Sequence, residues 1–371
     1  MHGSQPAIRT NAFGTAARQG CGVPGFTRSL SAVPRSPGIP KSETDPKRRL
    51  PRRAAKVKDN HGTLTVASLF AGAGGIDLGL IQAGLRVVWA VDNNPDCVAT
   101  YQANIGDHII CEDIANVKSC EIPSVDVIVG GFPCQGFSLA NRFRSGTDGR
   151  NQLYREMLRI IVDKQPKWFV AENVRGILSL EGGGVFERII EDFRMAGYRV
   201  RHDVVNMADH GVPQIRKRVI LLATRRDLPE EMTATHPSPS YAKSPLPGRC
   251  AWRTMNQALS ELGEAADSLP NSIGSSYKLA YRNFTGHRPT DGDKPSPTIL
   301  ARGNGKGGVC AIPHPQGLRR LTVRESAAVQ TFPNTFEFIG SVGSAYRQVG
   351  NAVPVVYGKM LGGMFQRVAR A

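Results

Sequence analysis

A β-branched run that leads into a glycine-rich loop and then into a helical pattern constrains the fold of this chain most. Residues 63–70 predict a strand, residues 71–75 a loop and residues 76–84 a helix. This succession opens a doubly wound α/β sheet, in which ligands bind at the carboxyl ends of the strands. Because glycine leaves backbone N–H groups accessible, the loop suits a dinucleotide or S-adenosylmethionine.

Carboxylates at the ends of the next two strands suit the same kind of ligand. The second strand, residues 87–91, ends at Asp92, about 20 residues after Gly72, where acidic residues accept ribose hydroxyls. Asp113 follows a short third strand and is a candidate acceptor for an adenine amino group. A helix cap or a turn is the alternative role for Asp113.

A cysteine follows the fourth predicted strand. Residues 125–129 are a short β-branched run, after which Pro133 restricts the approach to Cys134 and flanking glycines leave room for a substrate. This position suits a nucleophile, and a buried structural cysteine is the alternative. Residues 139–151, rich in arginine and glycine, predict a mobile active-site loop beside it.

Two later strands add polar groups at this edge. Because parallel strands finish on one edge, Glu172, at the end of the strand that begins at Trp168, can enter the same cleft as Cys134. Residues 214–222 also predict a strand, whose alternate residues share a face and suit contacts to phosphate or to a base carbonyl. These alternate residues are Gln214, Arg216 and Arg218. A solvated sheet edge is the alternative.

Composition divides the chain and indicates a polyanionic partner. The formal net charge is +16, of which residues 1–60 carry +9 and the remainder +7. A basic cleft for nucleic acid is predicted, with an ordinary solvated surface as the alternative. The domain boundaries expected are a disordered basic segment in 1–60, a first domain in 61–224, a smaller irregular domain in 225–316, and a return to the first domain in 317–371.

The N-terminal segment and the cysteines restrict the cellular context. Residues 1–60 lack the apolar core of a secretory signal, which leaves a transit-like leader, a nonspecific DNA-binding arm, an overcalled start codon or a tail without a specific role. Seven scattered cysteines without a CxxC pair favour a reducing compartment and no metal site. No apolar run is long enough to span a membrane.

Taken together, the motifs resemble the DNA cytosine-5 methyltransferase family of bacterial restriction-modification enzymes. The resemblance covers residues 63–223 and 318–367, with six motifs in the family's order. They are the loop Phe70-Ala71-Gly72 to Gly75, Pro133-Cys134-Gln135, Glu172-Asn173-Val174, Gln214-x-Arg216-x-Arg218, Arg320-Leu321-Thr322 to Gln330-Thr331-Phe332-Pro333, and Gln348-Val349-Gly350-Asn351-Ala352-Val353-Pro354. The segment 225–316 occupies the place of the family's target-recognition domain.

The resemblance implies a Rossmann-like methyltransferase domain that uses S-adenosylmethionine to methylate carbon 5 of a flipped-out cytosine in a specific double-stranded DNA sequence. Cys134 would add to the cytosine ring, Glu172 would act at ring nitrogen 3, Arg218 would hold the ring carbonyl, and Arg216 would contact a phosphate. The implied cofactor-binding residues are Phe70, Ala71, Gly72, Gly74, Gly75, Asp92, Asp113, Leu153, Asn351 and Val353. The implied substrate-binding residues are Pro133, Gln135, Ser138, Asn173 and Gln214.

Two positions depart from the family pattern. Ser68 replaces the usual Asp before the loop, so a loop hydrogen bond made by that Asp is not assured here. Asp92 replaces the usual Glu, which shortens the reach of the carboxylate to ribose by one methylene. The expected protein is a monomer in the cytoplasm, associated with the nucleoid through DNA. A cognate restriction endonuclease would share its target sequence without being bound to it.

Three other functions compete with this interpretation. An RNA (tRNA) cytosine-5 methyltransferase would use the same Cys134 and Glu172, although the Cys-Phe-Thr block usual in that branch is missing from this sequence. A catalytically silent DNA-binding relative is disfavoured because the cysteine, the glutamate and both arginines are present. A nucleotide-dependent oxidoreductase would use the glycine loop but would leave the Pro-Cys-Gln and Glu-Asn-Val motifs without a role.

Overall fold

The computed structural model describes residues 62–133, 153–264, 266–274, 290–301, 312–317 and 319–371. The predicted site residues Cys134, Gln135 and Ser138, the predicted loop 139–151 and the segment 1–60 lie outside these ranges. Residues 60–371 form one compact unit. Within the described ranges, no helix has the length and apolar character needed to cross a membrane.

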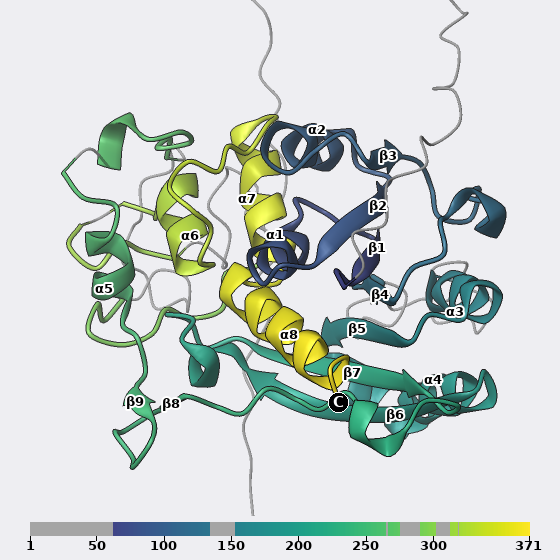
Figure 1. Cartoon of the computed structure of the whole chain (residues 1–371). Helices are drawn as coiled ribbons and strands as arrows, with labels where there is room; N and C mark the ends of the chain where they lie inside the picture. The colour runs from purple at the N-terminus through teal and green to yellow at the C-terminus, as the bar shows by residue number, and fades with distance from the viewer. Residues whose placement is uncertain (1–61, 134–152, 265, 275–289, 302–311, 318) are drawn as a thin grey trace, which may run out of the picture. The chain divides into compact units, whose positions relative to one another are not determined.

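A seven-stranded sheet forms the centre of this unit, in the order β3-β2-β1-β4-β5-β7-β6 (Figure 1). Its β-strands are β1 (Thr65–Leu69), β2 (Arg86–Asp92), β3 (Ile109–Cys111), β4 (Val127–Gly130), β5 (Trp168–Val174), β6 (Tyr198–Asn206) and β7 (Lys217–Arg225). The pairs from β3 to β5 are parallel, whereas β7 is antiparallel to both of its neighbours. The order reverses between β1 and β4, so the predicted doubly wound α/β class is confirmed, with its ligand crevice at this switch point.

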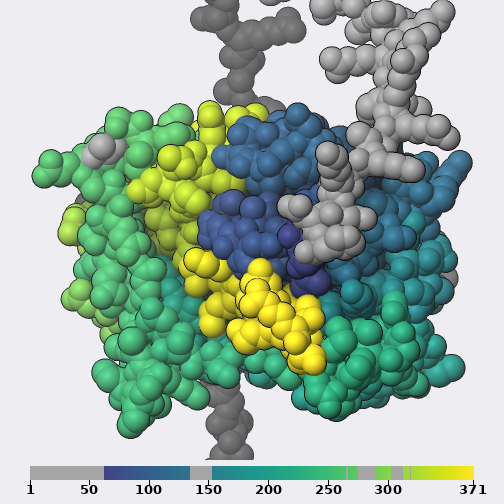
Figure 2. Space-filling view, in the orientation of Figure 1, coloured from purple at the N-terminus to yellow at the C-terminus, as the bar shows by residue number. Residues whose placement is uncertain are grey.

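Helices cover both faces of the sheet because each buries an apolar stripe. On one face, α3 (Leu153–Lys164) and α4 (Gly184–Met195) pack against alternate residues of β1, β4 and β5. On the other, α1 (Gly75–Gln82) and α8 (Val355–Val368) cover the remaining residues of the same strands. Helix α2 (Pro95–Asn104) packs at β3. The chain thus returns at its end to the first predicted domain, as the space-filling view shows in yellow against purple and blue (Figure 2).

The remaining elements belong to the second half of the chain and to short connections. The strands β8 (Tyr241–Ala242) and β9 (Cys250–Ala251) pair with each other, and the helices are α5 (Met255–Ser260), α6 (Val323–Val329) and α7 (Val342–Asn351). The 3₁₀ turns are η1 (Ser119–Glu121), η4 (Arg175–Gly183), η5 (Met207–His210), η6 (Glu230–Met232) and η7 (Ala266–Ser268).

The described part of residues 225–316 shares its core with the C-terminal segment. Met255, Ala258 and Ile299 pack in one hydrophobic cluster with residues of α6 and α7. The irregular character expected of this region agrees with its short strands and turns.

Strand β7 begins later than the sequence predicts. It starts at Lys217, and Gln214 instead forms an isolated bridge with Ser296. The prediction that residues 214–216 continue this strand is therefore wrong. The alternation of side chains that was expected from Gln214 to Arg218 does not hold across this junction.

Two glycines let α1 and α8 approach each other closely. A Cβ at Gly79 would lie 2.3 Å from Val355 O, and one at Gly358 would lie 2.6 Å from Ile76 O. Both distances are below any real carbon contact with a backbone oxygen. The contact between these helices therefore requires glycine at both positions.

Replacing Gly358 by alanine is expected to lower the free energy of unfolding by about 1–3 kcal/mol, because the methyl group would overlap the Ile76 carbonyl. Gly363 lies on the same helix and offers a matched control, since its nearest neighbour to a Cβ is the flexible Arg367 side chain at 3.8 Å. Gly363→Ala should raise the free energy of unfolding by about 0.5–1 kcal/mol, because alanine has a higher helix propensity than glycine. Urea denaturation compares the variants, and equal stabilisation of both would contradict the close helix contact.

Candidate active site

The glycine loop between β1 and α1 is closed on its protein side and open on the other. Phe70, Gly72 and Gly74 all have positive φ, at 55°, 57° and 81°. A Cβ at Gly74 would lie 2.3 Å from Ile105 Cδ1, and one at Gly75 would lie 2.4 Å from Val353 O. A Cβ at Gly72, by contrast, would meet no atom within 4 Å. The loop therefore exposes its backbone at Gly72, where a ligand can approach.

Asp92 at the end of β2 fixes this open position. Its Oδ2 accepts a hydrogen bond from Gly72 N at 2.8 Å, and its Oδ1 accepts one from Asn94 N at 2.9 Å. Burial raises the pKa of Asp92, and these two backbone hydrogen bonds oppose that shift. Each carboxylate oxygen keeps further acceptor capacity. The contact of Asp92 with ribose stays a prediction. The sequence did not predict the hydrogen bond between Asp92 and the Gly72 backbone.

Ser68 and Asp77 join the two ends of the same loop. Ser68 Oγ donates a 2.8 Å hydrogen bond to Asp77 Oδ1, and both side chains are fully buried. Burial raises the pKa of Asp77 to about 6, against the opposing effect of the Ser68 hydrogen bond. Asp77 also lies in the first turn of α1, where a negative charge is favourable. The serine that departs from the family pattern thus makes a hydrogen bond that only the folded structure reveals.

The other predicted cofactor residues differ in their burial and contacts. Leu153 begins α3 and, like Phe70 and Ala71, lies partly buried, while Val353 places its carbonyl at Gly75. Asn351 is the exposed last residue of α7. Asp113 is exposed, and its Oδ1 accepts from Ala115 N at 3.0 Å, which is the turn role named as its alternative. A contact from Asp113 to adenine stays a prediction.

Glu172 and Arg218 form an ion pair at the carboxyl edge of the sheet. Arg218 Nε lies 2.9 Å from Glu172 Oε1, and the side chains are only 11% and 14% exposed. A Cβ at Gly131 would lie 3.1 Å from Glu172 Oε2. The backbone therefore passes directly beside this carboxylate on its way to Pro133. Pro133 is exposed and directly precedes Cys134, the predicted nucleophile.

Asn173 holds the same backbone in place. Its Nδ2 donates to Phe132 O at 3.1 Å, its Oδ1 accepts from Val174 N at 2.9 Å, and the residue is 2% exposed. The Asn173 amide is thus buried and occupied by backbone partners, and its predicted contact with substrate stays a prediction. Its effect on a substrate would come through the position of the segment that ends at Pro133.

Gln214 and Arg216 are both buried and bonded to other parts of the protein. Arg216 is 1% exposed and donates to the carbonyls of Ile299, Gly350 and Ala352 at 3.0–3.1 Å. Burial, reinforced by neighbouring Arg218, lowers its pKa to about 9. Fully buried Gln214 donates to Gln330 Oε1 and accepts from Ile299 N. Both side chains thus bind protein in the interior, and their predicted contacts to phosphate and substrate stay predictions.

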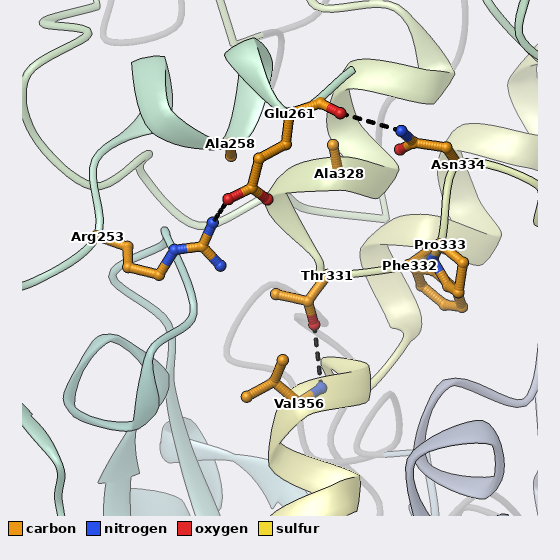
Figure 3. A pocket seen from close by; sticks show the side chains of 9 residues that line it. All are labelled: Arg253, Ala258, Glu261, Ala328, Thr331, Phe332, Pro333, Asn334 and Val356. Atoms are coloured by element: carbon orange, nitrogen blue, oxygen red, sulfur yellow. Dashed lines mark hydrogen bonds and ion pairs between the residues drawn. The ribbon is translucent and has the colours of Figure 1, made fainter. Parts of the chain in front are cut away.

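A separate pocket of about 210 Å³ between α5, α6 and the start of α8 contains none of the predicted site residues. Figure 3 shows its polar groups paired with one another: Glu261 pairs with Arg253, Asn334 donates to the Glu261 carbonyl, and Thr331 accepts from Val356 N. We assign it no chemistry.

Comparisons with known proteins agree with this arrangement. A model of the family described as C-5 cytosine-specific DNA methylase matches residues 64–366. The type II methyltransferase M.NgoFVII of Neisseria gonorrhoeae is 35% identical over 82% of this chain and 87% of its own length. M.BsuRI of Bacillus subtilis is 34% identical over 82% and 79%. The crystal structure of S. pombe Dnmt2 methyltransferase is similar in fold, with a TM-score of 0.60 at 20% identity over 83% of this chain and 98% of that one.

The Ser68–Asp77 contact predicts the effect of exchanging its partners. Ser68→Asp would place two buried carboxyl groups in contact, so we expect a loss of affinity for S-adenosylmethionine of about 10-fold or more. Ser68→Asp combined with Asp77→Ser recreates the hydrogen bond in the opposite direction and should recover most of that affinity. Calorimetric titration measures both variants, and a double variant no better than the single one would contradict the assignment.

Proposed function

The chain belongs to the C-5 cytosine-specific DNA methylase family, and on this premise we propose that it methylates a cytosine flipped out of a specific double-stranded DNA sequence, through a covalent adduct with Cys134. It is a DNA (cytosine-5-)-methyltransferase with S-adenosylmethionine as methyl donor. The observation that carries the proposal is the Glu172–Arg218 ion pair beside the backbone that leads into Cys134.

The residues around the glycine loop fit the cofactor. The backbone of Gly72 is accessible to a ligand, and Asp92 accepts a hydrogen bond from it while keeping further acceptor capacity. The Val353 carbonyl packs against Gly75 on the protein side of the loop. When bound, S-adenosylmethionine supplies a methyl group on a positively charged sulfur. The loop would orient the cofactor toward the switch point between β1 and β4, from which the segment of Cys134 also leaves the sheet.

The chemistry requires that carbon 5 of cytosine become electron-rich. Addition of the Cys134 thiolate to carbon 6 produces an enamine whose carbon 5 is nucleophilic. The addition places negative charge on the ring, which a proton held between Glu172 and ring nitrogen 3 relieves. Arg218 already binds Glu172 and has donors to spare, so it would hold the ring carbonyl beside it. Carbon 5 would take the methyl group that the cofactor supplies, and removal of the carbon 5 proton would then expel Cys134 as the thiolate and restore the ring.

The substrate base must leave the helix before any of these steps. A cytosine inside a duplex cannot present carbon 6 to a thiol, so it is flipped out at a cost of a few kcal/mol. The similarity to type II methyltransferases supports a defined target sequence, which a cognate restriction endonuclease would share. The predicted loop 139–151 would close over the flipped base.

Methyl transfer from labelled S-adenosylmethionine to plasmid DNA and to tRNA tests this function. Wild type should label DNA at cytosines of one short motif, mapped by bisulfite sequencing. Cys134→Ser should lower the rate on the order of 1000-fold or more because it removes the nucleophile. Glu172→Gln should lower it by about 100-fold to 10,000-fold because the amide supplies no proton.

A matched variant separates these roles from general damage. Lys164 is the last residue of α3, at the opposite end from Leu153, so the variant Lys164→Gln should retain wild-type activity. Label on tRNA alone would favour the RNA methyltransferase, and full activity of Cys134→Ser would rule out the covalent route.

A further inference from the structure

A second pocket opens at the catalytic edge of the sheet and has no role in the proposed chemistry. It has a volume of about 550 Å³ and lies where β5 and β6 end and β7 begins. Its lining residues are Arg175, Val204, Asn206, Asp209, Ile215, Lys217 and Trp252.

The pocket lies on the other face of the sheet from Glu172 and Arg218. Register pairs Lys217 with Asn206, and the next residue, Arg218, with Val205. Because neighbouring residues of a strand point to opposite faces, Lys217 faces away from the side that carries Arg218. The pocket and the Glu172–Arg218 pair are therefore next to each other along one edge but are separated by the sheet itself.

The electrostatic character of the pocket is cationic. Arg175 and Lys217 are exposed, and neither forms an ion pair with any residue that the structure describes. The acidic Asp209 accepts a 2.7 Å hydrogen bond from the Trp252 indole. Two cations without an ion pair among the described residues suit an anionic ligand with several acceptor oxygens.

The pocket is also held rigidly between two parts of the chain. Trp252 follows β9, and its backbone N donates to Ala242 O at 2.8 Å. The neighbouring strand β8 packs on η5, where a Cβ at Gly211 would lie 2.7 Å from the Tyr241 ring. One wall thus comes from the central sheet and the other from the region 225–316.

We propose that this pocket binds a backbone phosphate of the double-stranded DNA substrate, and the inference rests on the proposed function. Phosphate contacts from Arg175 and Lys217 would set the orientation of the duplex relative to Glu172 and Arg218 on the other face. Such contacts carry no sequence information of their own. They act on the affinity for DNA and on its salt dependence, because each phosphate neutralised by the protein releases counterions.

The test measures binding of fluorescent duplexes, with and without the target motif, between about 50 and 200 mM salt. For Arg175→Gln and Lys217→Gln, we expect the slope of log affinity against log salt to fall by about 1 each. Affinity should fall equally for both duplexes, and affinity for S-adenosylmethionine should be unchanged. Lys164→Gln removes the same charge at the opposite end of α3 and should leave the slope unchanged. Urea denaturation verifies that each variant is folded.

Three outcomes distinguish the possibilities. An unchanged slope in both variants, while the wild type binds and methylates DNA, would overturn the phosphate site and leave the proposed function standing. A loss of affinity confined to the duplex with the target motif would also overturn the phosphate site, since such a loss would indicate contact with bases. A wild type that methylates tRNA and not DNA would refute the proposed function and, with it, this role of the pocket.

Discussion

The rest of the site depends on the hydrogen bonds that the buried guanidinium of Arg216 donates to backbone carbonyls. A charged group without exposure to water is costly unless it is hydrogen-bonded, and three backbone carbonyls accept from the two terminal nitrogens of Arg216. Its Nε has no partner among the described residues. Those carbonyls belong to Ile299, Gly350 and Ala352, on segments that are far from β7 in sequence. Because Val353 follows Ala352 directly and closes the glycine loop at Gly75, Arg216 links the catalytic edge to the cofactor loop.

The two halves of the site are rigid for the same kind of reason. Asp92 binds the backbone of Gly72, and Asn173 binds the backbone of Phe132, so a side chain at a strand end fixes each loop. Glu172 and Arg218 lie on the adjacent strands β5 and β7 and fix each other. The site therefore needs little movement of its strand ends, and whatever closes over a substrate must come from other segments.

Sequence patterns predicted the parts of this arrangement that depend on local order along the chain. Strands, the glycine loop and the position of Glu172 at a strand end follow from periodicity and from the rule that parallel strands finish on one edge. The direction of Gln214 and Arg216 could not be predicted, because it depends on where β7 begins and on which carbonyls lie nearby in the fold. The Ser68–Asp77 contact escaped prediction because the two residues meet only after α1 packs on the sheet.

The reversed direction of β7 explains how three consecutive residues serve three different purposes. The parallel strands end at the catalytic edge, whereas β7 begins there because it is antiparallel to β5. Its first residues therefore lie at the same edge as Glu172. Arg216 lies before the strand and points into the interior, Lys217 faces the second pocket, and Arg218 faces Glu172. One short cationic segment thus joins the C-terminal segments to the sheet and holds Glu172, and in the proposed function it would also contact the substrate backbone.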